Sequence, residues 1–174
     1  MSKENKIKPK NYIILGVIIV ITVIAVFYMR GWYIATKEYY ATNSVMLDTI
    51  NEINVEELDN YILENPKFIL YVSSGQNGNI KSFEKQMKKI IVDEELESIT
   101  LYLNSDNANM ELLKQKLNKI TDNETINKKI SSNSEVSIYI IENGKMTKAI
   151  INAEKSSPNQ IKKILQKYGV IENA

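Results

Sequence analysis

The sequence contains no cysteine and no histidine. The lack of cysteine excludes disulfides, thiol redox chemistry, cysteine nucleophiles and zinc–thiolate sites, and the lack of histidine excludes any triad or metal site that needs an imidazole. Carboxylate, lysine, tyrosine or serine chemistry stays open on composition alone. The 22 basic and 21 acidic residues leave a net charge of +1. Because nucleic-acid-binding domains concentrate basic charge on one face, we expect no nucleic-acid partner.

An uncharged apolar run occupies residues 12–29. As an α-helix these residues span about 27 Å, which matches the hydrocarbon core of a bilayer. Tyr12 stands at one end of the run, and further aromatic residues gather at the other end, as they do at membrane interfaces. A buried core helix and a cleaved signal peptide are the alternatives, but a signal peptide would have a shorter apolar region followed by a small-x-small cleavage site. We therefore predict a retained transmembrane helix over residues 12–29.

Basic residues are distributed unevenly about this helix. Four lysines lie in the preceding tail of residues 1–11, whereas only Arg30 and Lys37 follow closely. The excess of basic residues marks the cytoplasmic side, so we expect a cytoplasmic N-terminus and an extracytoplasmic C-terminal domain. The abundance of lysine, asparagine and isoleucine is typical of an AT-rich bacterial genome. The expected location is therefore a bacterial cell membrane, crossed once.

Residues 30–47 read as a juxtamembrane connector rich in tyrosine. The connector has no clear period, so the pattern leaves open whether it continues the helix or lies against the membrane or the domain. Its tyrosines suit a membrane-interface belt, and the alternative is a protein-binding surface.

Residues 48–174 show the alternating strand and helix patterns of one α/β domain. Apolar and β-branched runs predict strands over 48–53, 68–72, 98–103, 136–141 and 146–151. Helical spacing and caps predict helices after Asn54, from Ile80, over 108–120 and from Pro158. The dipeptide Asn143-Gly144 predicts a tight hairpin turn, and residues 121–135 are polar enough to predict a loop, with room for one helical turn.

This order of elements requires both parallel and antiparallel strand pairs, so we expect a mixed sheet covered by helices on both faces. The pattern resembles the thioredoxin fold over about residues 48–170. Phe68–Val72 resembles the central strand of that family, residues 137–145 resemble its late strand and Asn-Gly turn, and residues 157–168 resemble its terminal helix. The predicted fold class is thus an α/β, thioredoxin-like three-layer sandwich preceded by one transmembrane helix.

The resemblance also implies where an active member of the family would carry its catalytic residues. A Cys-x-x-Cys pair would lie within residues 75–80, a cis-proline at the position of Val136, and a buried acidic residue near Ile69. None of these residue types is present at those positions. The resemblance therefore implies a domain without dithiol exchange, and we expect no enzymatic activity, no cofactor and no metal.

The loop after the central strand is the candidate partner-binding site. It comprises Ser73, Ser74, Gly75, Gln76, Asn77, Gly78 and Asn79, with Val136 beside it. A serine nucleophile here would need activation by a lysine such as Lys81, and no nucleophile-elbow motif is present. Binding of an anion at the start of the following helix is a second alternative, without a P-loop motif to support it. The acidic residues between Asp93 and Glu97 lack the pattern of a calcium loop and predict a solvated face.

The expected function is that of a membrane-anchored binding or scaffold protein in a bacterial envelope or export assembly, with a protein partner. The export assembly is suggested by small membrane-anchored proteins of this fold, some of which resemble bacteriocin-transport accessory proteins. One alternative is an immunity-type membrane protein that binds a toxin. Another is an enzyme that uses serine, lysine or carboxylate chemistry on the same scaffold.

Overall fold

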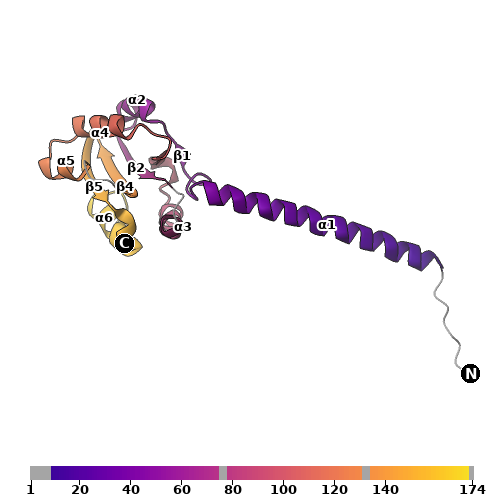
Figure 1. Cartoon of the computed structure of the whole chain (residues 1–174). Helices are drawn as coiled ribbons and strands as arrows, with labels where there is room; N and C mark the ends of the chain where they lie inside the picture. The colour runs from indigo at the N-terminus through magenta and orange to yellow at the C-terminus, as the bar shows by residue number, and fades with distance from the viewer. Residues whose placement is uncertain (1–8, 75–77, 131–133, 173–174) are drawn as a thin grey trace, which may run out of the picture. The chain divides into compact units, whose positions relative to one another are not determined.

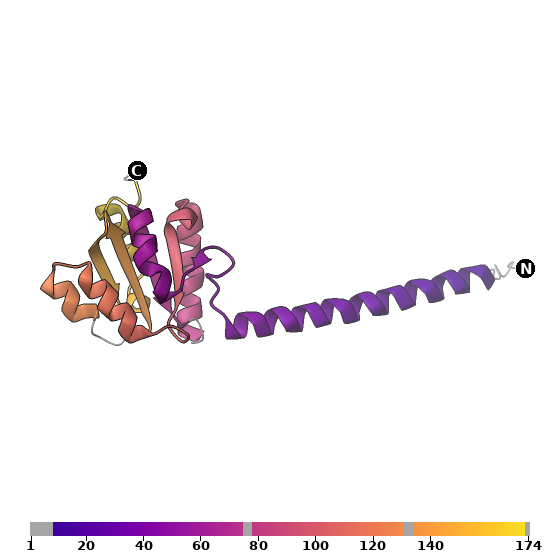
Figure 2. The ribbon, with the colours of Figure 1, turned by 90° about the horizontal axis from the view of Figure 1, so that it is seen from above.

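The computed structural model describes residues 9–74, 78–130 and 134–172, which fall into two compact units that meet at Thr42. The first unit is built on α1 (Pro9–Thr42), a single unbroken helix (Figure 1, Figure 2). Its 34 residues extend over about 51 Å, which is longer than a membrane span requires. The helix thus continues through most of the connector, whose conformation the sequence pattern left open. The polar side chain of Thr22 is satisfied inside α1, because its hydroxyl donates to the carbonyl of Ile18 at 2.8 Å.

The second unit contains a five-stranded mixed sheet in the order β1-β3-β2-β4-β5. Strands β1 and β2 each pair in parallel with β3, whereas β4 pairs antiparallel with β2 and β5. The bounds of the strands are β1 (Asn51–Glu52), β2 (Lys67–Ser73), β3 (Thr100–Asn104), β4 (Val136–Glu142) and β5 (Lys145–Ile151). The predicted mixed sheet is confirmed.

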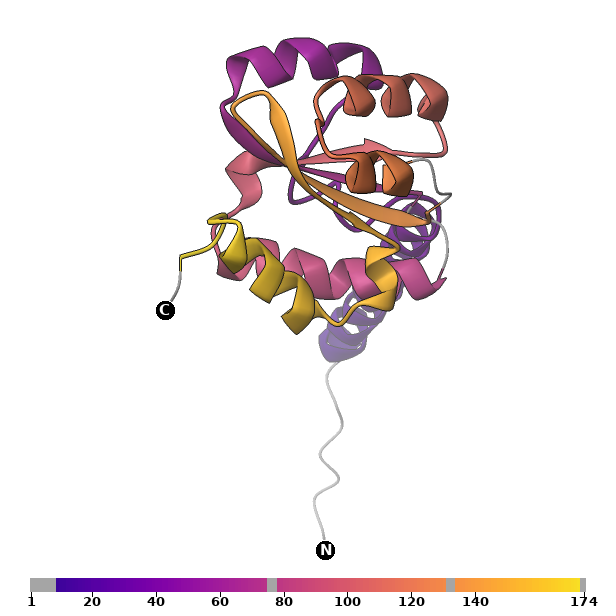
Figure 3. The same ribbon diagram turned by 90° about the vertical axis from the view of Figure 1, so that its left-hand side faces the viewer.

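Helices cover both faces of this sheet, and Figure 3 shows the three layers, with α2 and α4 on one side and α3 and α6 on the other. The first face carries α2 (Leu58–Glu64), α4 (Met110–Lys119) and α5 (Glu124–Ile130), and the second carries α3 (Gly78–Asp93) and α6 (Pro158–Lys167). The described part of this unit also contains the short 3-10 helices η1 (Val55–Glu57), η2 (Glu97–Ile99) and η3 (Ala153–Lys155).

The central strand β2 explains why the sequence has a continuous apolar run there. Ile69 and Tyr71 pack toward α3 and α6, whereas Phe68, Leu70 and Val72 pack toward α2 and α4. A strand that is buried on both faces cannot alternate between apolar and polar residues. All five side chains are at least 97% buried, so β2 is the axis of both core clusters.

Local sequence signals placed several element ends correctly. The carboxylate of Glu57 accepts from the backbone N–H of Asn54 at 3.3 Å, at the start of η1. Ser157 and Gln160 form a reciprocal capping box at the start of α6. Asn143 and Gly144 adopt positive φ angles of 52° and 74°, as a two-residue hairpin turn requires.

Three expectations need correction. The predicted loop over 121–135 contains α5, a helix of seven residues that packs on β5 and α4. The strand predicted over 48–53 is reduced to β1, because the N–H groups of Thr49 and Ile50 bond to the Met46 carbonyl in a turn. The compact unit begins at Thr42 rather than Asp48, because Met46 is fully buried in the core between β2 and α3.

Candidate functional site

A buried polar cluster lies at the end of β2, under the loop predicted to bind a partner. The carboxylate of Glu84, in the second turn of α3, is fully buried. Its Oε1 atom accepts from the Ser73 hydroxyl at 2.5 Å and from the Ser44 hydroxyl at 2.8 Å, and its Oε2 atom accepts from the backbone N–H of Val45 at 3.2 Å. We call these four residues the Glu84 cluster. Its hydrogen bonds join the start of the compact unit, the end of β2 and α3.

Sequence reasoning missed Glu84, although a signal for it exists. Glu84 lies four residues after Ile80 and three before Met87, so it shares the helix face that the core buries. A carboxylate in such a position is costly unless hydrogen-bond donors surround it. Here three donors do so, and two of them come from residues about 40 positions away in the chain.

Two buried tyrosines adjoin the cluster. The Tyr102 hydroxyl donates to the Ser73 carbonyl at 2.9 Å, and the rings of Tyr71 and Tyr102 are stacked with centroids 6.3 Å apart. Burial raises the pKa of Tyr71 well above its usual range, and the nearby Glu84 carboxylate raises it further. Burial also raises the pKa of Tyr102 to about 12. Both phenols are therefore protonated and neutral near neutral pH, and neither is a nucleophile there.

The raised pKa of Tyr102 predicts a loss of stability in alkali. Below pH 10 the phenol is neutral in both states, but above it the unfolded chain ionises while the folded chain keeps its proton up to about pH 12. The free energy of unfolding should therefore fall as the pH rises from 10 to 12, and less steeply in Tyr102→Phe. Urea unfolding at several pH values, together with tyrosinate absorbance, tests this. A step for Tyr102 at the pH where exposed tyrosines ionise would contradict the prediction.

The structure brings together two residues of the predicted loop site. Ser73 and Val136 are direct partners in the antiparallel pairing of β2 with β4, and both are fully buried. Ser74 is half-buried. Residues 75–77 lie outside the described residues, and Gly78 and Asn79 begin α3. Ile69, at the position expected for the family's acidic residue, is a buried core side chain. Of the residues described at these two strand ends, Ser73 and Val136 are buried and Ser74 is partly exposed.

One acidic residue after α3, Glu94, has a structural role. The ammonium of Lys162 in α6 forms an ion pair with the carboxylate of Glu94, which joins the two helices of one layer. Within residues 9–74, 78–130 and 134–172, no group of three or more carboxylates is arranged to hold a metal ion.

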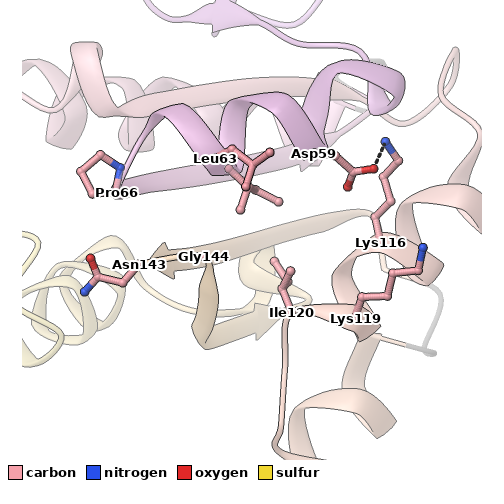
Figure 4. A pocket seen from close by; sticks show the side chains of 9 residues that line it. Asp59, Leu63, Pro66, Lys116, Lys119, Ile120, Asn143 and Gly144 are labelled. Carbon is pink, nitrogen blue, oxygen red and sulfur yellow. Dashed lines mark ion pairs between the residues drawn. The ribbon is translucent and has the colours of Figure 1, made fainter.

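A separate pocket of about 580 Å³ lies at the opposite end of β2 (Figure 4). It is bounded by α2, the end of α4 and the turn between β4 and β5. Leu63 and Ile120 face the middle of the pocket, Pro66 and Asn143 stand at one end, and Asp59, Lys116 and Lys119 stand at the other. Sequence reasoning did not find this pocket, because its lining comes from three segments that meet only in the folded chain. The one local signal is Leu63, an apolar residue on α2 outside the buried stripe.

Comparisons with known proteins identify the fold. No family model matches the sequence, and no curated protein matches it significantly. Solved structures do match the folded chain. The crystal structure of thioredoxin f2 from Chlamydomonas reinhardtii has a TM-score of 0.51 and 9% sequence identity, and the match covers 68% of this chain and 95% of that one. Mitochondrial thioredoxin 3 from Saccharomyces cerevisiae has a TM-score of 0.48 and 16% identity, with coverages of 69% and 96%.

The share of each chain in the match with thioredoxin f2 is compatible with the two-unit description. Nearly the whole of thioredoxin f2 is matched by 68% of this chain, a share that the unit Thr42–Ala174 is large enough to contain. At such low identity the likeness shows the fold and not the activity. Because the chain contains no cysteine, a disulfide-exchange site cannot be formed from its own residues. The chain therefore contains a domain of thioredoxin-like α/β fold, without cysteines for disulfide exchange, that follows one long apolar helix.

Proposed function

We propose that this protein is a membrane-anchored binding module whose thioredoxin-like domain docks a protein partner of a bacterial envelope or export assembly. The observation that carries the proposal is the combination of a complete thioredoxin-like fold with a chain that has no cysteine. The strand ends beside the segment where the fold would present its thiols carry a buried serine and a buried valine. A domain that has the thioredoxin-like fold without the cysteines for disulfide exchange is suited to binding a protein.

The character of α1 supports the membrane anchor. One stretch of this helix, Lys10–Tyr39, is long and apolar enough to cross a membrane. Its apolar side chains are exposed around the whole helix and not confined to one stripe, which suits contact with lipid. Aromatic side chains at the end of this stretch, including Trp32 and Tyr33, suit the membrane interface. The lysines before the helix favour a cytoplasmic N-terminus, which would place the domain outside the cytoplasm.

Protease treatment and crosslinking of intact cells test the proposal. Protease should remove the domain without lysis, and crosslinking followed by detergent extraction should recover a protein partner in fixed stoichiometry. A variant truncated after residue 42, which keeps α1 and lacks the domain, is the control and should recover none. Recovery of no partner in the wild type, or protection of the domain in intact cells of a single-membrane organism, would contradict the binding role or the orientation, respectively.

A further inference from the structure

The pocket between α2, α4 and the β4–β5 turn combines an apolar wall with positive charge at one end. Leu63 is 84% exposed, and the other large apolar side chain exposed in the compact unit, among the residues described there, is Val92 at 46%. Leu63 lies across the pocket from the half-buried Ile120, and Pro66 extends the apolar surface (Figure 4). An apolar side chain left in water at the edge of a concave surface is a feature of binding sites.

The charged end of the pocket is partly preorganised. The side chain of Lys116 is only 9% exposed, and its ammonium is held by the Asp59 carboxylate at 3.0 Å and the Glu56 carbonyl at 3.1 Å. This pair neutralises its own charges and fixes the first turn of α2 against α4. Lys116 is therefore a structural residue of the pocket wall, and not the group that a ligand would meet.

Lys119 supplies the unpaired positive charge of the pocket. It lies one turn after Lys116 on α4, is exposed, and borders the same pocket. In the part of the chain that the structure describes, its ammonium forms no hydrogen bond or ion pair. With Lys116 and Asp59 paired, the pocket carries one net positive charge, beside the apolar surface of Leu63 and Ile120. A matching ligand carries a carboxylate next to an apolar side chain.

We infer that this pocket binds a peptide segment of the partner protein in which an apolar side chain packs on Leu63 and Ile120 and an acidic side chain pairs with Lys119. The inference rests on the proposed binding function and gives it a location away from the loop after β2. Nucleic acid does not fit, because the pocket has one unpaired cation and no aromatic side chain for stacking a base. The positive charge of Lys119 therefore requires an acidic side chain in the partner segment.

Peptide titrations followed by NMR test the inference on the full chain in detergent micelles. The probes are acetylated peptides with one Leu and one Asp separated by no, one or two Ala residues, each paired with an Asn twin. At least one Asp peptide should shift the amide signals of residues 62–65, 116–120 and 143–144 with a dissociation constant near or below roughly 1 mM. Its Asn twin should bind about threefold more weakly, the size of one exposed ion pair.

Two variants and their matched controls assign the effect to residues. Lys119→Gln should remove the difference between the Asp and Asn peptides, and Leu63→Ser should weaken both peptides severalfold. Lys114→Gln on the same helix and Val92→Ser, an exposed apolar residue on α3, should change neither. Absence of saturable shifts at the pocket, or equal binding of the Asp and Asn peptides, would overturn the inference.

Crosslinking of the cellular partner to the wild type and to a pocket variant distinguishes a failure of this inference from a failure of the proposed function. If a partner crosslinks to the wild type and equally to the Leu63→Ser/Lys119→Gln double variant, the pocket is not the docking site and the binding function stands. If the wild type has no partner, the binding function itself fails. Loss of the partner in the double variant alone supports both.

Discussion

Replacing Glu84 with Ala should destabilise the compact unit by roughly 3–5 kcal/mol. The reason is that the substitution leaves three buried donors without their acceptor: the hydroxyls of Ser44 and Ser73 and the N–H of Val45. It also opens a cavity on the buried face of α3. The measurement is denaturant unfolding of the full chain in micelles, followed by the near-ultraviolet circular dichroism of the buried tyrosines.

Two comparison variants make this result specific. Gln86→Ala, an exposed residue on the same helix, should change stability by no more than about 0.5 kcal/mol. Glu84→Gln keeps the shape and one acceptor oxygen, so its effect should lie between those of the other two. Hydrogen exchange at the Val45 amide should accelerate in Glu84→Ala before global unfolding. A Glu84→Ala protein that keeps both its stability and the protection of Val45 would show that the cluster does not hold residues 44–46 in place.

Placing two lysines in the middle of α1, as Ile18→Lys with Ile21→Lys, should abolish retention in the membrane. Each lysine at the centre of a span disfavours insertion by about 2.5–3.5 kcal/mol, so the pair costs roughly 6 kcal/mol. At this depth neither side chain can reach the interface by extending along the helix. The fraction of protein that resists extraction from membranes with alkaline carbonate measures the effect.

The matched control for this experiment is Ile18→Leu with Ile21→Leu, which preserves the apolar character and should remain in the membrane. A double-lysine variant that still resists extraction would contradict a lipid-inserted α1. It would mean that a bound partner, or the domain itself, holds the protein in the membrane fraction.

The sequence alone predicted what depends on neighbours in the chain. The capping box of Ser157 and Gln160, the Asn143-Gly144 turn and the apolar run of β2 are local patterns with local physical causes, and each was confirmed. The order of these elements was enough to predict a mixed sheet with helices on both faces. The helix α5 was missed, because only two of its seven residues, Ile126 and Ile130, are apolar, and the helix is held by packing against β5.

Only the tertiary structure decided where polar and apolar groups gather. Glu84 and Ser44 are 40 residues apart in the chain, and each is an ordinary polar residue until the fold places one beside the other. The pocket beside Leu63 likewise requires α2, α4 and the β4–β5 turn to meet. The absence of cysteine is visible in the sequence. The sequence by itself therefore determined that this thioredoxin-like domain cannot carry out disulfide exchange with its own residues. What it can bind depends on surfaces assembled from distant segments, because side chains from separate elements become neighbours only when the sheet is packed.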